Sequence, residues 1–185
     1  MMPKLKKNKS VVIVCGDPES TFNEILIKTL KNKVQKKTKY SIILVCSKKL
    51  LENELKKFKV KVNFQDLRGQ KSLHKNRIYI IDIPLDYKNL SLNKKNSYIK
   101  KSFQIGLDQI KERQSLALIN GPISKKTFLN KKFLGITEYI SNKYKTKKTA
   151  MLIYNKKLSV CPVTTHLPIK LVANKITRNL IEEKI

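Results

Sequence analysis

One histidine stands where an apolar run ends and a polar loop begins, a position well suited to ligand binding. It is His166, in the stretch Thr164-Thr165-His166-Leu167-Pro168 that follows the apolar run 158–163. Loops that follow strands carry much of the chemistry of α/β proteins, and a neutral imidazole is a good ligand for a borderline divalent cation. A structural histidine held by hydrogen bonds is the alternative. The sequence thus predicts either a ligand-binding or a structural role for His166.

Two other short stretches have a composition typical of binding loops. The first is Asn120-Gly121-Pro122-Ile123-Ser124-Lys125, which follows an apolar run, and the second is Gly135-Ile136-Thr137-Glu138-Tyr139. In the second stretch, the Thr137 hydroxyl could contact a ligand, or it could cap a helix over residues 138–144. Both stretches are therefore further candidates for a binding site.

The elements that would position these loops alternate between strands and helices. Apolar, β-branched runs predict strands, and apolar residues three and four positions apart predict helices. Thr21 and Glu24 have the spacing of a capping box, and Ser47 could cap the second helix. Residues 65–76 are expected to form a surface loop. Strands are expected at 10–15, 40–46, 60–64, 77–83 and 115–119, and helices at 21–34, 48–58, 94–113 and 173–185.

The architecture that this alternation predicts is a three-layer α/β fold with helices on both faces of the sheet. Apolar runs at 149–154 and 158–164 are separated by only three polar residues, so we expect an antiparallel hairpin and hence a mixed sheet. The polar stretch after Pro84 suggests one segment over residues 1–88 and a second over residues 89–185. The helical pattern at the end has no C-cap signal, so the second segment is expected to be incomplete.

Composition limits the class of protein. The chain has 185 residues, of which 41% are hydrophobic, and this is enough for a buried core. No run approaches the roughly 18 to 20 apolar residues of a membrane span, and the N-terminus lacks the apolar region of a signal peptide, so we expect a cytoplasmic protein. Cys15, Cys46 and Cys161 form no C-x-x-C pair, and all three are expected to be buried as small hydrophobic residues.

The net charge of +28 is high enough to suggest a nucleic-acid-binding protein. However, lysine supplies 37 of the 41 basic residues, and aromatic residues are not interleaved with a basic stripe. This pattern favours a solvated lysine-rich surface that attracts small anionic substrates. A basic module that binds nucleic acid remains the alternative from a different functional class.

Four short motifs, taken in order, resemble those of the 4-hydroxythreonine-4-phosphate dehydrogenase family of pyridoxal phosphate biosynthesis. They are Gly16-Asp17-Pro18 after the first strand and the three stretches at 120–125, 135–139 and 164–168. The resemblance covers essentially the whole chain, as the N-terminal portion of the family. It implies a fold of the isocitrate and isopropylmalate dehydrogenase type. It also implies a cytoplasmic homodimer that uses NAD or NADP and a divalent metal (Zn, Mg or Co) to oxidise and then decarboxylate 4-phosphohydroxy-L-threonine.

The resemblance also assigns residues. It implies that His166 is one of three histidines that hold the metal, and that Thr137 contacts the substrate. Ile136 stands where the family has a substrate-contacting histidine, which leaves room for a related phosphorylated sugar acid such as threonate 4-phosphate. The other two metal histidines and most cofactor-binding residues belong to the C-terminal half of the family. We therefore expect this chain to be inactive by itself, and no catalytic or cofactor-binding residue is assigned.

Overall fold

The chain forms two compact units, Met1–Ser124 and Lys125–Ile185. The computed structural model describes residues 9–113, 115–129, 132–146 and 149–184. The boundary between the units differs from the one expected after residue 88. The reason is that the long helix α4 (Leu92–Arg113) packs on the strands of the first unit and so belongs to it.

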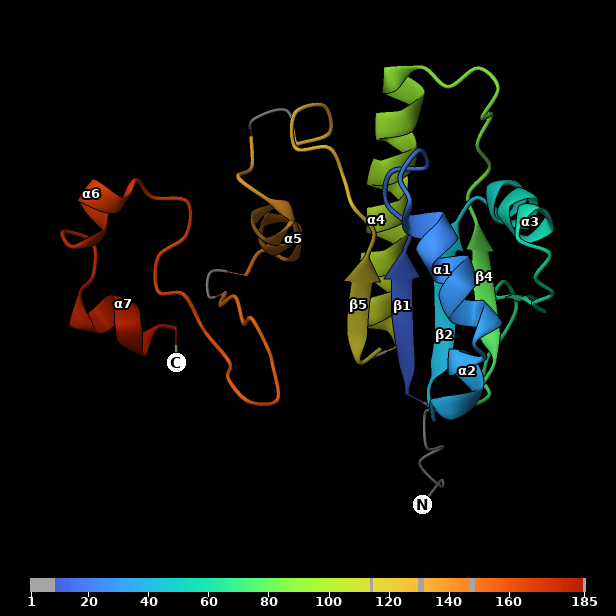
Figure 1. Cartoon of the computed structure of the whole chain (residues 1–185), viewed down its shortest axis with the longest axis horizontal. Coiled ribbons are helices and arrows are strands. Elements are labelled where there is room, and N and C mark those ends of the chain that lie inside the picture. Colours follow the sequence, from blue (N-terminus) through green and yellow to red (C-terminus); the bar gives the residue numbers. More distant parts are fainter. Residues whose placement is uncertain (1–8, 114, 130–131, 147–148, 185) are drawn as a thin grey trace. The chain divides into compact units, whose positions relative to one another are not determined.

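A five-stranded parallel sheet forms the centre of the first unit (Figure 1). The strand order is β3-β4-β2-β1-β5, and every neighbouring pair is parallel. The expected mixed sheet is therefore wrong for the described residues, because the runs at 149–154 and 158–164 form only one antiparallel bridge outside this sheet. The strands are β1 (Ser10–Val14), β2 (Ser41–Cys46), β3 (Gln65–Asp66), β4 (Ile78–Asp82) and β5 (Ala117–Asn120).

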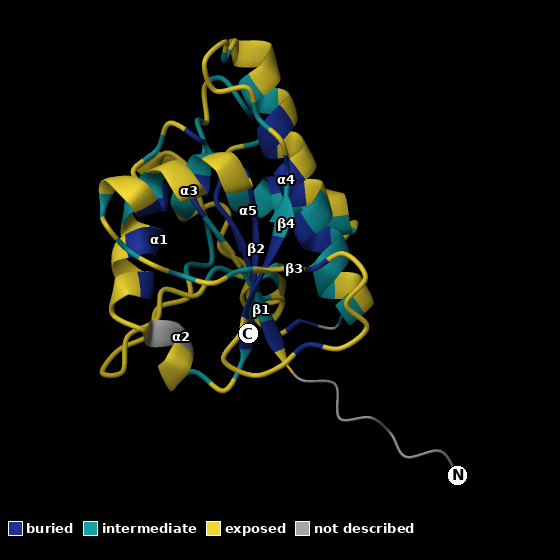
Figure 2. Ribbon diagram, turned by 90° about the vertical axis from the view of Figure 1, so that its right-hand side faces the viewer, coloured by how far each residue is buried: buried dark blue, intermediate teal, exposed yellow. Residues whose placement is uncertain are grey.

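Helices cover both faces of the sheet and give the three layers that the sequence predicts. α1 (Phe22–Lys31) and α3 (Lys48–Lys57) lie over one face, and α4 lies over the other (Figure 1). Burial is concentrated on the strands and on the helix sides that face them (Figure 2). A Cβ added to Gly106 of α4 would lie 2.4 Å from a methyl group of Val14, so this glycine lets α4 approach β1 closely.

Of the capping residues predicted for α1 and α3, only the one for α3 is confirmed. Ser47 caps α3 as predicted, because its hydroxyl accepts a hydrogen bond from the Leu50 amide at 3.4 Å. The capping box at Thr21 is wrong, since this residue has helical backbone angles and its side chain makes no capping bond. Ile25, an apolar residue of α1, is 56% exposed. The chain turns after α1 into the short α2 (Val34–Lys37), and the side chain of Val34 lies outside the described residues.

The strand expected at 60–64 is absent from the structure. Val60, Val62 and Phe64 are half-buried, and they pack against the apolar cluster between the sheet, α1 and α3 without pairing to a strand. The short β3 follows at once, inside the stretch expected to be a loop. Alternating apolar residues thus reflect contact with the core here, not a strand in the sheet.

The described residues of the second unit form three helices and connecting segments. They are α5 (Ile136–Tyr144), α6 (Ile169–Val172) and α7 (Arg178–Glu182). The helix expected over 173–185 is correct only for α7, because extended Thr177 caps that helix with its hydroxyl and separates it from α6. None of the helices in the described ranges combines the length and hydropathy that crossing a membrane requires.

The three cysteines differ in exposure. Cys15 and Cys46 are buried as predicted, and their thiols are hydrogen-bonded to each other. This hydrogen bond and burial raise the pKa of Cys46 well above its ordinary value. Cys161 is exposed, so the prediction is wrong for this residue. The apolar run around it does not enter the sheet and therefore does not bury it.

Candidate functional site

Two of the four motifs meet at the carboxyl ends of the parallel strands in the first unit. The backbone amide of Asp17 donates a hydrogen bond to the carbonyl oxygen of Pro122 at 2.9 Å. Gly16 has φ +75°, and a Cβ there would lie 2.5 Å from the same oxygen. A Cβ on Gly121 would lie 2.1 Å from the carbonyl oxygen of Cys15. The two glycines therefore allow the loops after β1 and β5 to pack backbone against backbone.

A lysine from α4 joins two acidic residues of the loop after β1. The ammonium group of Lys95 lies 2.7 Å from a Glu19 carboxylate oxygen and 3.4 Å from one of Asp17. The side chains of Lys95 and Asp17 are only 16% and 14% exposed. The hydrogen bond to Glu19 is the main cause that raises the pKa of Lys95. The cluster fixes the Gly16-Asp17-Pro18 loop to α4.

The neighbouring strand ends are also fixed by specific hydrogen bonds. The Ser47 amide donates to the hydroxyl of Tyr98 on α4 at 2.9 Å, and the Lys48 amide donates to Asp82 at 2.8 Å. Burial raises the pKa of Tyr98, so this phenol stays protonated. The loops at this edge of the sheet are thus held in place by the first unit itself.

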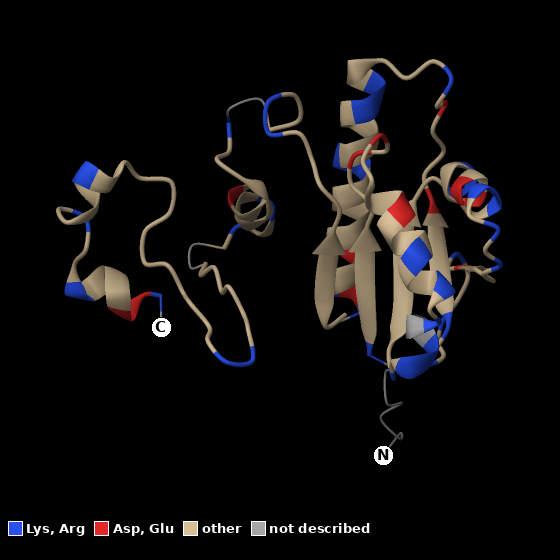
Figure 3. Cartoon of the chain, viewed as in Figure 1, with Lys and Arg blue, Asp and Glu red and all other residues tan. Residues whose placement is uncertain are grey.

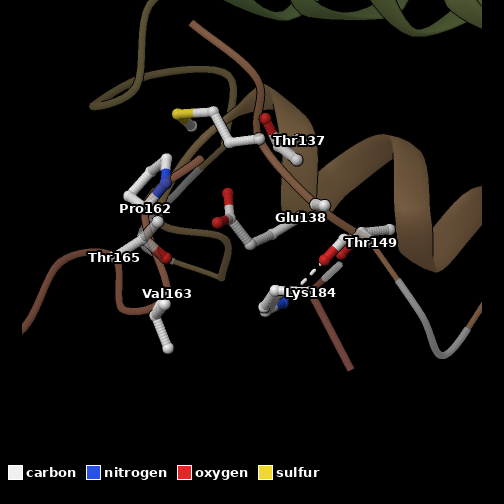
Figure 4. A pocket seen from close by; sticks show the side chains of 9 residues that line it. Thr137, Glu138, Thr149, Pro162, Val163, Thr165 and Lys184 are labelled. Atoms are coloured by element: carbon white, nitrogen blue, oxygen red, sulfur yellow. Dashed lines mark hydrogen bonds between the residues drawn. The ribbon is translucent and has the colours of Figure 1, made fainter. Parts of the chain in front are cut away.

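In the second unit, the other two motifs line one cavity (Figure 4). Its volume is about 50 Å³, and its walls include Thr137 at the start of α5 and Thr165 of the Thr164-Thr165-His166 stretch. A cavity of this size has room for a few water molecules or for one small polar group. The structure therefore brings together two stretches that lie almost thirty residues apart in the sequence. In the sequence analysis, each of them is a separate candidate binding loop.

The carboxylate of Glu138 is the most unusual group in this cavity. It points across the cavity toward Pro162 and Thr165 (Figure 4). Its Oε2 atom is buried and has no hydrogen-bond partner among the described residues. A Cβ at Gly135 would lie 3.1 Å from this oxygen, so a glycine there leaves room for the carboxylate. A buried carboxylate oxygen without a donor is costly, and this cost points to a missing donor group.

Lys184 also lines the cavity, but its ammonium group is already bonded. It donates a hydrogen bond to the carbonyl oxygen of Thr149 at 2.6 Å (Figure 4). Thr137 is the second residue of α5, and Gly135 is the N-cap. The alternative that Thr137 caps this helix is therefore wrong, and its hydroxyl is available to the cavity. Ile136, the first residue of α5, is half-buried.

His166 is exposed and does not line the cavity, although its neighbour Thr165 does. Its backbone has φ +59°, a region that few residues other than glycine adopt. Within the described ranges, no three His, Cys, Asp or Glu side chains gather into a group that could hold a metal ion. A complete divalent-metal site therefore does not fit these residues, and the four motifs contain one imidazole, that of His166.

Sequence reasoning assigned Thr137 and His166 but missed three residues of these sites. Glu138 and Thr165 lie inside two of the four motifs, so the sequence indicates the stretches that contain them. It does not indicate that both residues line the same cavity. No sequence pattern indicates that Lys95 contacts Asp17, because it lies more than seventy residues from Asp17 in a helix with many lysines.

The fold and the two sites define the class of protein. It is a three-layer α/β protein with a parallel sheet, and two of its four motif loops follow the carboxyl ends of strands. The sequence model of the family described as "Pyridoxal phosphate biosynthetic protein PdxA" matches residues 38–185, and the chain belongs to this family. The family that the four motifs indicated is thereby confirmed.

Individual relatives agree with this assignment. The chain is 32% identical over 179 residues to the 4-hydroxythreonine-4-phosphate dehydrogenase of Sulfurihydrogenibium sp. (strain YO3AOP1), covering 95% of this chain and 55% of that protein. It is 27% identical over 188 residues to the protein of that name from Aquifex aeolicus, covering 96% and 56%. The chain thus spans about half the length of the curated relatives it matches.

Solved structures share the fold. The 4-hydroxythreonine-4-phosphate dehydrogenase of Klebsiella pneumoniae matches with a TM-score of 0.77 and 22% identity, over 95% of this chain and 57% of that chain. The protein of that name from Burkholderia phymatum matches with a TM-score of 0.77 and 18% identity, over 95% and 55%. These likenesses establish the α/β fold and leave the substrate to be argued from the site.

Proposed function

We propose that this chain supplies part of the substrate site of a dehydrogenase that oxidises and then decarboxylates 4-phosphohydroxy-L-threonine. One observation carries the proposal: Thr137 and Thr165, from two separate family motifs, line one cavity. Hydroxyl groups in a cavity next to an unpaired carboxylate are suited to a small polar substrate. The family membership of the chain supports the same assignment.

Glu138 supports an amino acid as the substrate. The ammonium group of 4-phosphohydroxy-L-threonine would supply the donor that the buried Oε2 atom lacks. The cavity volume of about 50 Å³ suits this end of the substrate and is too small for the whole molecule. In this arrangement Glu138 orients the substrate, and the Thr137 hydroxyl donates or accepts a further hydrogen bond.

Threonate 4-phosphate is the second candidate substrate, and Ile136 is the residue that favours it. Ile136 cannot form the hydrogen bond that the family's histidine at this position provides, so the site departs from the usual pattern. Threonate 4-phosphate carries a hydroxyl in place of the ammonium group, and it would leave the Glu138 charge unneutralised. The buried carboxylate therefore favours the amino acid over the sugar acid.

The cofactors and assembly are proposed from the family resemblance. His166 would contribute one ligand to a divalent metal (Zn, Mg or Co), and the other ligands would come from outside these 185 residues. NAD or NADP would be the electron acceptor. The complete enzyme would be a cytoplasmic homodimer, and this chain alone would produce no NADH or NADPH.

Calorimetric titration of the 185-residue chain with the two candidate substrates tests this proposal. We expect 4-phosphohydroxy-L-threonine to bind about tenfold more tightly than threonate 4-phosphate, since only the former pairs with Glu138. Glu138→Gln should remove this preference, and Thr137→Ala should weaken binding of both ligands.

Thr29→Ala is the matched control. Thr29 is exposed on α1, and its hydroxyl donates a hydrogen bond to the Ile25 carbonyl oxygen at 2.8 Å. In the sequence, Thr29 is more than a hundred residues from the residues that line the cavity. This variant should bind both ligands as the unmodified chain does. Equal binding of the two ligands, with no effect of Glu138→Gln or Thr137→Ala, would contradict the proposal.

A further inference from the structure

A second concave site lies in the first unit, at the amino-terminal ends of the strands. It is a groove with a volume of about 660 Å³, and its walls come from the end of α1, α2, the segment after α3 and the start of β4. Of the four motif loops, those at 16–18 and 120–125 lie at the opposite, carboxyl ends of these strands. No residue that lines the groove also lines the cavity of Thr137 and Thr165, so the groove is distinct from the substrate site proposed above.

The groove is lined by basic side chains, and lysines and arginines gather at this end of the first unit (Figure 3). Six of its twelve lining residues are basic, compared with 41 of 185 in the whole chain, so the groove exceeds the general lysine bias. We call it the basic groove; its cations are Lys31, Lys33, Lys36, Lys59, Lys61 and Arg77.

Acidic groups do not neutralise this charge. Among the described residues that line the basic groove there is no Asp or Glu. In the part of the chain that the structure describes, the ion pairs of lysine and arginine involve other residues, such as Lys28 with Glu24 and Lys57 with Glu54. Six uncompensated cations around one concavity produce a strong local field for anions.

The backbone of the groove is also unusual. Lys33, Lys59 and Asn76 have positive φ values of 55°, 52° and 60°. This conformation favours glycine and asparagine, so lysine at two such turns is unexpected on conformational grounds alone. All three residues line the groove, and two of them are lysines.

We propose that the basic groove binds a compact polyphosphate anion. Lysine ammonium groups bind phosphate oxygens as point charges, and the amide groups of Asn63 and Asn76 in the lining can add hydrogen bonds. The described residues of the lining include no aromatic side chain, so they offer no surface on which a base could stack. The groove therefore recognises the phosphate chain, whether this is inorganic or the tail of a nucleotide.

Calorimetric titration of the 185-residue chain with sodium tripolyphosphate tests the proposal. The double variant Lys33→Ala/Lys61→Ala should weaken binding about tenfold, since two charged partners are lost. The charge-matched control is Lys100→Ala/Lys101→Ala on the exposed surface of α4, and it should bind as the unmodified chain does. Equal weakening in both variants would mean that net charge alone attracts the anion, and would overturn the proposal.

Two further ligands distinguish the source of the phosphates. ATP should bind no more tightly than tripolyphosphate, because the groove has no stacking surface for adenine. ATP that binds more tightly by tenfold would overturn the assignment to the phosphate chain. A single-stranded RNA oligonucleotide that displaces tripolyphosphate from the groove at equal phosphate concentration would likewise overturn it, in favour of a nucleic-acid site.

Discussion

The carbonyl oxygen of Pro122 accepts a hydrogen bond from the backbone amide of Asp17 at 2.9 Å, which joins the loops after β1 and β5. This contact requires the two backbones to come closer than a side chain would permit. Both glycines at the contact, Gly16 and Gly121, belong to the family motifs. These motif residues therefore shape the loops, and the site in the first unit depends on their packing.

Gly16→Ala should destabilise the first unit by about 2 to 4 kcal/mol, from the strain of a positive φ and from overlap with Pro122. Gly69→Ala is the control, because Gly69 has φ +78° and nothing within 4 Å of an added Cβ. This control should cost only about 1 to 2 kcal/mol. Urea unfolding followed by circular dichroism measures both values, and equal destabilisation would contradict the close packing.

Lys95→Met should lower stability at pH 7 by about 1 kcal/mol, because it leaves Asp17 and Glu19 without their cation. The pKa of Lys95 is raised above its ordinary value of 10.5 in the folded chain. The contribution of Lys95 to the free energy of unfolding is therefore fully present below pH 10.5. This contribution is lost as the pH rises through the higher pKa that Lys95 has in the folded chain. Unfolding measured at pH 7 and at pH 11 should show the difference from the unmodified chain shrinking at pH 11. A constant difference would argue against the ion pair as its cause.

Cys161 should react with a thiol reagent in the folded chain much faster than Cys15 and Cys46. It is exposed, whereas the other two thiols are buried and the pKa of Cys46 is raised. Titration with 5,5′-dithiobis(2-nitrobenzoate) should therefore give one fast thiol per chain, and Cys161→Ser should remove it. Two or three fast thiols would contradict the burial of the β1 and β2 ends.

Glu138→Gln should raise the stability of the chain by about 1 kcal/mol while weakening the binding of 4-phosphohydroxy-L-threonine. A neutral amide costs less to bury than a carboxylate with an unpaired oxygen. Opposite effects on stability and binding are the mark of a residue kept for function. Unfolding by urea gives the first value and calorimetry the second, and a loss of stability would show that Glu138 has a structural role.

Much of the fold of the first unit could be predicted from local patterns. The β-branched run Ser10–Val14 and the cap at Ser47 both have the roles that their sequence indicates. The strand predicted at 60–64 does not form, because alternating apolar residues also occur where an irregular segment packs on a core. The prediction that Cys161 is buried was wrong for a related reason. Apolar residues are buried only where another element covers them.

The candidate site was predictable in its motifs but not in its geometry. Thr137 and Thr165 line the same cavity because of the path of the chain between them, which short motifs do not encode. The contact of Lys95 with Asp17 likewise depends on the packing of α4 over the sheet. The unpaired oxygen of Glu138 emerges only from the complete set of neighbours around it.

We propose that the Thr137 and Thr165 stretches together bind the amino end of the substrate. The most direct test is to follow the backbone amide signals of the ¹⁵N-labelled chain by NMR during titration with 4-phosphohydroxy-L-threonine. We predict that the signals of Thr137, Glu138 and Thr165 shift together and give one dissociation constant. Shifts confined to the basic groove, at Lys33 and Lys61, with these three signals unmoved, would contradict the claim.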